Sequence, residues 1–257
     1  MAAAPARGPD VNAPVLETRA LDKRFGGLHV TRQVSLALQA GERVALIGPN
    51  GAGKTTLVHQ LSGVLAPTSG QVLLDGADVT RRSQAWRVRS GLARTFQITT
   101  LAPHLPVQRQ VELALFEREG LTGRAWRSID AYPAIAAEAR ELLARLGLAE
   151  HAGWATERLA YGEQRLVEIA LALALKPRVL LLDEPMAGVP QGEGDRLLAA
   201  LDALPAELAV VIIEHDMDLV FRFARRIVVL AEGAVLADGA PDAIRRDPRV
   251  REAYLGH

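Results

Sequence analysis

The sequence predicts an α/β protein built on a parallel sheet that carries a phosphate-binding loop. Residues 48–56 read GPNGAGKTT and fit the phosphate-loop pattern G-x-x-x-x-G-K-[ST] at every fixed position. A strand-like run at 42–47 precedes this loop and a helix-like segment at 55–64 follows it, which is the order such a loop requires. The apolar runs 179–182 and 209–213 each lead into carboxylates, as central parallel strands do where they open on an active site.

The segments before the loop predict a small antiparallel β-region. Residues 15–21 and 34–38 have the apolar clustering of short strands, and Phe25-Gly26-Gly27 marks a turn between them. After the loop, residues 70–74 and 91–96 predict two further strands, and the second of these ends at Gln97.

The middle of the chain changes to helical spacing. Apolar residues recur at helix intervals between residues 106 and 175, which predicts a helical insertion. Strands at 227–230 and 234–237 and a closing helix at 242–254 complete the prediction. Residues 1–14 are rich in Ala and Pro and have no apolar run of signal-peptide length, so we expect a disordered tail and no export.

Composition limits the classes of function. The 257 residues are 49% hydrophobic, which is ample for a core, and the 30 basic and 30 acidic residues balance, so nothing indicates a nucleic-acid partner. There are no cysteines, which excludes disulfides and thiol chemistry. The longest apolar stretches, such as 169–175, are far shorter than the roughly 18 residues that a membrane span requires.

The phosphate loop predicts a nucleoside triphosphate and Mg²⁺ as ligands. The glycines let successive N–H groups point at phosphate oxygens, Lys54 reaches the β- and γ-phosphates, and the Thr55 hydroxyl ligates Mg²⁺. A dinucleotide-binding fingerprint fails because its third glycine would fall on Thr56. The alternative to a phosphate-binding loop is a Gly-rich turn that matches the pattern by chance. The expected binding residues are Gly48, Pro49, Asn50, Gly51, Ala52, Gly53, Lys54, Thr55 and Thr56.

Three residues at strand ends are candidates for the hydrolytic chemistry. Asp183 is suited to hold Mg²⁺ through its water shell, and Glu184 to orient or deprotonate the attacking water. Only the turn that ends the strand can bring both side chains to the γ-phosphate, because strand neighbours point to opposite faces. His215 follows a second strand and could contact the same phosphate. Phe25 either stacks on an adenine ring or fills the core.

The segment Leu159-Ala160-Tyr161-Gly162-Glu163-Gln164 makes the resemblance specific, since it precedes a helix that we expect to begin near Glu163. Together with the phosphate loop, Gln97, the 179–184 strand and His215, in that order and spacing, it resembles an ATP-binding-cassette (ABC) ATPase. The resemblance covers essentially all of residues 15–257. It implies a RecA-like core, an antiparallel β-subdomain and an inserted α-helical subdomain at about 98–175.

The resemblance also implies a mechanism and partners. Two such domains dimerise head to tail around two ATP molecules, so that Ala160, Tyr161, Gly162 and Glu163 face the nucleotide held by the other subunit. Gln97 would ligate Mg²⁺, take part in hydrolysis and report nucleotide state to a membrane partner. The implied partners are integral-membrane permease subunits, a second ABC ATPase and, indirectly, a periplasmic solute-binding protein. The implied location is peripheral, on the cytoplasmic face of the inner membrane.

Within this superfamily the chain is most similar to the longer ATPase of branched-chain amino-acid importers. The segments that carry this similarity are KRFGG at 23–27, ARTFQ at 93–97, LDEPMAG at 182–188, EHDMDLV at 214–220 and EAYLG at 252–256. The chain departs from the usual pattern at Ala160, where Ser is common, and at Pro190 and Gln191, where an Asn-Pro pair is expected.

Other classes of nucleotide-binding protein match the sequence less well. A switch GTPase needs an Asn-Lys-x-Asp motif, and neither Asn12 nor Asn50 is followed by Lys. A soluble cassette ATPase of DNA repair or translation shares the chemistry, but repair forms insert long coiled coils and translation forms carry two cassettes. Importers of urea, amides or aromatic acids and exporters of lipid or lipopolysaccharide remain as related alternatives.

Overall fold

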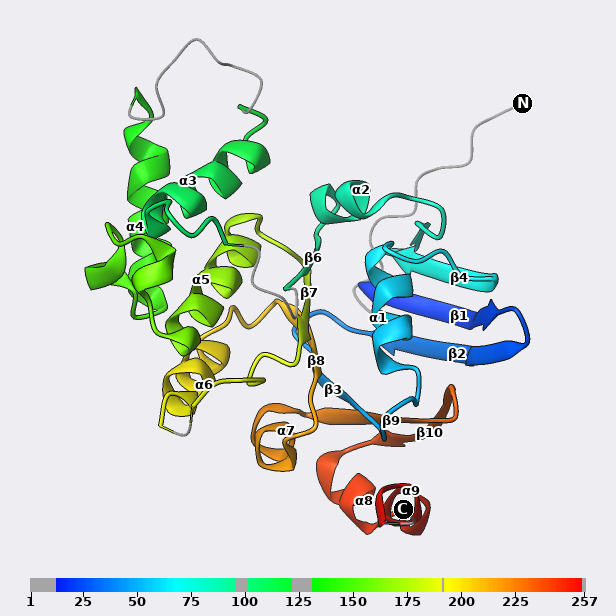
Figure 1. Ribbon diagram of the computed structural model, residues 1–257. Coiled ribbons are helices and arrows are strands. Elements are labelled where there is room, and N and C mark those ends of the chain that lie inside the picture. Colours follow the sequence, from blue (N-terminus) through cyan, green and yellow to red (C-terminus); the bar gives the residue numbers. More distant parts are fainter. Residues whose placement is uncertain (1–12, 96–100, 122–130, 191, 256–257) are drawn as a thin grey trace, which may run out of the picture.

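A computed structural model describes residues 13–95, 101–121, 131–190 and 192–255 (Figure 1). Its centre is a six-stranded sheet in the order β10-β9-β3-β8-β7-β6. Strands β9, β3, β8, β7 and β6 run parallel, and β10 pairs antiparallel with β9. The strands are β3 (Arg43–Ile47), β6 (Leu92–Arg94), β7 (Val179–Asp183), β8 (Ala209–Ile213), β9 (Arg226–Ala231) and β10 (Ala234–Gly239).

A second, antiparallel sheet has the order β2-β1-β4-β5. It comprises β1 (Leu16–Phe25), β2 (Leu28–Leu38), β4 (Ser69–Leu74) and the short β5 (Ala77–Asp78). The first two strands form a hairpin longer than the sequence predicts, because the β1–β2 pairing contains register shifts that interrupt a simple apolar alternation. Ala20 and Gln33 have positive φ angles of 46° and 48° at these irregularities.

Helices and strands cover both faces of the central sheet, because its strands are apolar at successive positions. Ala45 and Ile47 of β3 belong to one core cluster, and the intervening Val44 and Leu46 belong to the other. The antiparallel sheet and α1 (Lys54–Ser62) pack on the second face. The first face packs against α3 (Val107–Arg118), α4 (Pro133–Arg145), α5 (Tyr161–Ala174), α6 (Gly194–Asp202), α7 (Met217–Phe223), α8 (Pro241–Arg246) and α9 (Pro248–Leu255).

The helical insertion stands apart from the small sheet. In Figure 1, α3, α4 and α5 gather on one side of the molecule, opposite β1, β2 and β4. Short 3₁₀ turns at Ala149–His151 and Thr156–Arg158 connect α4 to α5, and α2 (Gln84–Arg89) precedes β6. Within the described ranges, no helix has the length and apolar character that crossing a bilayer would require.

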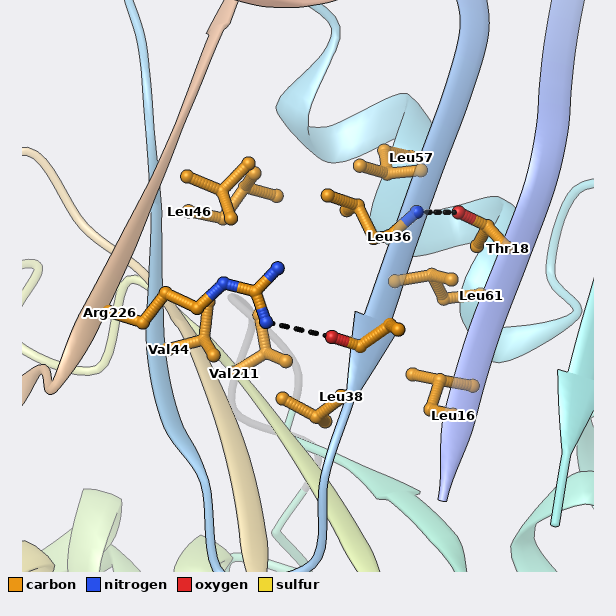
Figure 2. Close-up of a pocket in the computed structure, with 12 residues that line it drawn as sticks. Leu16, Thr18, Leu36, Leu38, Val44, Leu46, Leu57, Leu61, Val211 and Arg226 are labelled. Atoms are coloured by element: carbon orange, nitrogen blue, oxygen red, sulfur yellow. Dashed lines mark hydrogen bonds between the residues drawn. The ribbon is translucent and has the colours of Figure 1, made fainter. Parts of the chain in front are cut away.

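The two sheets meet at an apolar joint, which Figure 2 shows. A small cavity of about 30 Å³ lies there, lined mainly by leucine and valine side chains. Arg226 of β9 crosses the joint: its Nη1 donates to the Ala37 carbonyl at 2.8 Å and to Glu42 Oε1 at 3.0 Å. The joint is therefore part of the core and holds the two sheets together.

Several predicted boundaries differ from the structure. The closing helix predicted at 242–254 is two helices, α8 and α9, because Pro248 cannot donate the backbone hydrogen bond that a continuous helix needs there. The strand predicted at 91–96 ends at Arg94 in the described part of the chain, and α5 begins at Tyr161 rather than near Glu163. The predicted tail at 1–14 lies almost wholly outside the described residues.

Candidate nucleotide-binding site

The phosphate loop joins β3 to α1, in the strand–loop–helix order that the sequence predicts. Gly48 has a φ of 154°, and a Cβ there would lie 2.2 Å from the Leu230 carbonyl oxygen. Gly53 has a φ of 98°, and a Cβ there would lie 2.6 Å from the Val30 oxygen. Glycine is therefore required at both fixed positions, for conformation and for space.

The N-terminus of α1 is suited to an anion. Its N-cap residue is Gly53, and no side chain caps the first turn. The uncapped N–H groups and the helix dipole together favour a phosphate at this end. Thr55 is exposed and Thr56 is half-buried, while Asn50 and Gly51 are exposed at the crest of the loop.

Lys54 lies over the loop. Its Nζ donates to the carbonyl oxygens of Gly48 at 2.6 Å and Pro49 at 3.0 Å. Burial lowers the pKa of Lys54, and the negative charge of Glu184 acts in the opposite direction. The structure thus brings the predicted phosphate-binding lysine near the predicted hydrolytic carboxylate.

The ends of β7 and β8 lie in register. Asp183 pairs with Ile213 in the parallel ladder, and Glu184 N–H donates to the Ile213 carbonyl at 2.9 Å. Glu184 has a φ of 46°, a left-handed conformation that is uncommon for a non-glycine residue and frequent at functional sites. The strand therefore turns at Glu184, and His215 begins the corresponding turn after β8.

Asp183 is paired with a residue that the sequence analysis did not single out as part of the site. Arg94 Nη2 lies 2.6 Å from Asp183 Oδ2, and both side chains are about 95% buried, with exposures of 5% and 4%. A buried carboxylate needs such a partner to remain charged. His59 of α1 lies near this pair, since burial lowers its pKa, Arg94 lowers it further and Asp183 raises it.

The donor set suits Mg²⁺. A threonine hydroxyl and a carboxylate are hard oxygen ligands of the kind that this ion prefers, usually with phosphate oxygens and water completing the shell. Among the described residues there is no cluster of three His, Cys, Asp or Glu side chains that could hold a metal by itself. Gln97, the other predicted ligand, lies outside the described residues.

The 160–163 segment begins α5, with Ala160 as its N-cap residue. Glu163 Oε2 accepts from the Ala160 N–H at 3.1 Å, and Glu193 Oε2 accepts from the Gly162 N–H at 2.9 Å. The Tyr161 hydroxyl accepts from Arg165 Nη2 at 2.7 Å. Two backbone donors at this helix end therefore bind carboxylates of the same chain, as the positive end of a helix dipole favours.

The 160–163 segment and the phosphate loop belong to opposite sides of the central sheet. Leu159 and Leu166 pack in the core cluster on one face, and Leu57 and Val58 of α1 pack in the cluster on the other. In a single chain the two motifs are therefore anchored in different core layers, apart from each other.

Phe25 ends β1 and is 50% exposed, so the core-filling alternative is wrong. Lys23 Nζ lies 5.0 Å from its ring centroid. Stacking of this ring on an adenine stays a prediction.

Two other contacts at the site join residues far apart in the sequence. The Gly48 N–H hydrogen-bonds the phenol oxygen of Tyr254 in α9, whose pKa burial raises to about 12. Glu214 is 2% exposed and accepts backbone hydrogen bonds from two loops. In the sequence, Tyr254 and Glu214 stand out only as members of segments that resemble the family. Those segments predicted neither contact.

Comparison with known proteins agrees with this geometry. The ABC transporter family model matches residues 31–187, and a model described as branched-chain amino acid ATP-binding cassette transporter matches residues 234–257. BraF of Pseudomonas aeruginosa, a high-affinity branched-chain amino acid transport ATP-binding protein, is 38% identical over 255 residues, which are 96% of this chain and 99% of BraF.

Two further similarities extend this result. LivG of Escherichia coli K12, which carries the same description, is 38% identical over 257 residues, covering 96% of this chain and 99% of LivG. The crystal structure of a nucleotide-free ATP-binding cassette from an ABC transporter superposes with a TM-score of 0.82 at 28% identity, covering 95% of this chain and 100% of that structure.

Proposed function

The chain belongs to the ABC transporter family, and from this premise we propose that it is the ATP-hydrolysing subunit of an importer for branched-chain amino acids. The observation that carries the proposal is similarity to BraF along nearly the whole length of both chains. The match of residues 234–257 to a branched-chain transporter model supports the same subfamily at the C-terminal end.

ATP with Mg²⁺ supplies the phosphoanhydride bond whose hydrolysis drives transport. The loop N–H groups and the N-terminus of α1 bind the phosphates, and Lys54 neutralises charge on the β- and γ-phosphates. Thr55, Asp183 and Gln97 would hold the Mg²⁺ ion, which would neutralise charge on the phosphates. Glu184 orients or deprotonates the attacking water, and His215 contacts the γ-phosphate.

Hydrolysis requires a second ATPase subunit. The two motifs are separate within one chain and become adjacent when two subunits pack head to tail, so that the N-terminus of α5 caps the phosphate held by the other subunit. Ala160 offers only its backbone, because a methyl group stands where a serine would donate a hydroxyl. Gly162 offers a backbone N–H. Closure on ATP and reopening after hydrolysis move the permeases.

Glu193 occupies the Gly162 N–H that this arrangement offers to phosphate, so we expect Glu193→Gln to favour closure. A hydrogen bond to a charged group contributes about 1.5–3 kcal/mol and one to a neutral group about 0.5–1.5 kcal/mol. The substitution therefore removes about 1 kcal/mol, and the ATP concentration for half-maximal dimerisation should fall by about fivefold. Sedimentation of the full chain against ATP concentration measures this. The control is Asp195→Asn, the same charge change at an 89% exposed side chain on α6. An unchanged or raised midpoint for Glu193→Gln would contradict the competition.

The permease is expected to bind in a groove beside α2. One hollow of about 450 Å³ lies between α2 and α3, and another of about 200 Å³ lies between α2, β6 and α5. They share the lining residues Gln84, Val88 and Leu175, so they form one continuous groove. Thr95 lines it, two residues before Gln97 in the sequence, which supports the proposed link between nucleotide state and permease.

Co-expression with the permease subunits tests the proposal. The chain should then be recovered with membranes and, expressed alone, should not. Val88→Asp places a charge in the groove and should lower membrane recovery severalfold. Val64→Asp makes the same change at a 50% exposed position away from the groove and should not. If the amount of chain recovered with membranes depends neither on the presence of the permeases nor on Val88→Asp, the proposed transport complex would be contradicted.

A further inference from the structure

Glu214 is a buried carboxylate between the two turns of the hydrolytic site. It follows β8 directly and its side chain is 1% exposed. Such burial of a carboxylate is costly unless hydrogen bonds satisfy both of its oxygens. Here the donors are backbone N–H groups from two different loops, which come together only in the folded chain.

The first loop is the turn after β7. Glu214 Oε1 accepts from the Met186 N–H at 3.0 Å. The same turn is fixed at its start by Glu184, whose N–H donates to the Ile213 carbonyl at 2.9 Å and whose carbonyl accepts from the Ala187 N–H at 3.0 Å. Two backbone bonds therefore hold Glu184 in its left-handed conformation, and the Glu214 side chain fixes the same turn two residues further on, at Met186.

The second loop is the turn after β8. Glu214 Oε2 accepts from the His215 N–H at 3.1 Å and from the Asp216 N–H at 3.5 Å. Asp216 in turn caps α7 through its Oδ1, which accepts from the Asp218 N–H at 2.9 Å. The His215 side chain is 71% exposed, so this backbone is held while the imidazole stays accessible.

The two oxygens of one carboxylate thus serve the two loops separately. An ionised carboxylate accepts at both oxygens, whereas a glutamine of the same shape has one acceptor and one NH₂ group. Burial raises the pKa of Glu214, and the three backbone N–H groups oppose that shift by stabilising the charged form. Replacement by glutamine would set its NH₂ group against a backbone donor at one of the two turns.

We propose that Glu214 is a positioning residue that joins the turn carrying Glu184 to the turn carrying His215, so that the two groups facing the γ-phosphate move as one unit. This inference rests on the roles proposed for Glu184 and His215. A displacement of about 1 Å at a reacting group can cost about 10²-fold in rate. Glu214 can therefore affect turnover without touching the nucleotide, by holding the two turns in place.

The first test measures ATP binding and turnover of the full-length Glu214→Gln protein. We expect kcat to fall by about 10-fold to 100-fold, while ATP affinity measured by calorimetry stays within about twofold, because the phosphate loop is unchanged. The matched control is Glu112→Gln, which replaces an equally buried carboxylate on α3. Normal kcat in Glu214→Gln, or an equal loss in Glu112→Gln, would overturn the inference.

A double-mutant cycle separates positioning from general damage. If Glu214 acts through Glu184, adding Glu214→Gln to Glu184→Gln should change the residual rate by less than about twofold, whereas an independent defect would multiply. Hydrogen exchange should also quicken in both turns together, at residues 184–188 and 215–218. Faster hydrogen exchange in neither turn, or in only one of them, would contradict the proposal that Glu214 couples the two turns.

The outcomes distinguish this inference from the proposal on which it rests. Near-normal turnover in Glu184→Gln would remove Glu184 from its role and overturn both. Loss of turnover in Glu184→Gln with normal turnover in Glu214→Gln would overturn only the positioning role of Glu214. If Glu214→Gln does not fold, Glu214→Asp, which keeps the charge on a shorter side chain, takes its place in the same cycle and should show the same loss of kcat.

Discussion

Glu184→Gln should still bind ATP but turn it over at least 10²-fold more slowly. The substitution keeps the shape of the side chain and part of its hydrogen bonding, but it removes the charge that would orient or deprotonate the attacking water. Asp183, Lys54 and the loop are unchanged, so the nucleotide should bind with nearly normal affinity. Steady-state hydrolysis and equilibrium ATP binding of the same preparation measure the two effects.

Glu207→Gln is the control for this experiment, because it makes the same chemical change at an exposed carboxylate before β8. It should hydrolyse ATP at the wild-type rate. Retention of near-normal turnover by Glu184→Gln would exclude Glu184 as the hydrolytic carboxylate, and loss of ATP binding would show that its charge supports the nucleotide site instead.

Gly162→Asp should abolish ATP-dependent dimerisation. A Cβ at this position would lie 2.7 Å from Glu193 Oε2, so the new side chain displaces that carboxylate and sets its own against the phosphate of the other subunit. An acidic residue in the first turn favours the helix itself, so α5 should remain folded. ATP binding by the single chain should persist, since the phosphate loop lies on the other side of the sheet.

Ala160→Ser, two residues before Gly162, should have the opposite effect on dimerisation. Its hydroxyl can donate one charge-assisted hydrogen bond to the same phosphate, so dimerisation should require less ATP. Both variants are measured by sedimentation in the Glu184→Gln background, where slow hydrolysis preserves the closed state. A Gly162→Asp protein that dimerises normally would show that the 160–163 segment is an ordinary helix start with no role at the nucleotide.

The fold class was predictable because its signals are local. The phosphate loop needs glycine at Gly48 and Gly53 for steric reasons, and the strands β7 and β8 are buried on both faces, so each reads as a short apolar run. The prediction of a core with an antiparallel β-region and a helical insertion is confirmed by the structure and by its similarity to a known cassette. The short α2, α6 and α7 were missed, since six to nine residues carry little periodicity.

The parts of the site that were missed are contacts between distant residues. Arg94 and Asp183 are 89 residues apart, and Gly162 and Glu193 are 31 apart. A charged residue in a sequence looks the same whether it is solvated or buried against a partner, so pairing of this kind becomes visible only in the fold. Glu214 illustrates this, because its strand was recognised while its two loops could not be inferred.

Simultaneous measurement of ATP hydrolysis and uptake of labelled leucine tests the central claim most directly. The chain is reconstituted in vesicles with the partners proposed for it, which are permease subunits, a second ATPase and a solute-binding protein. The account predicts that leucine enters only while ATP is hydrolysed, and that uptake and hydrolysis fall together when Glu184→Gln replaces the wild-type chain. Leucine uptake that continues at the wild-type rate with the Glu184→Gln chain, or hydrolysis by the complete assembly with no uptake of any branched-chain amino acid, would contradict it.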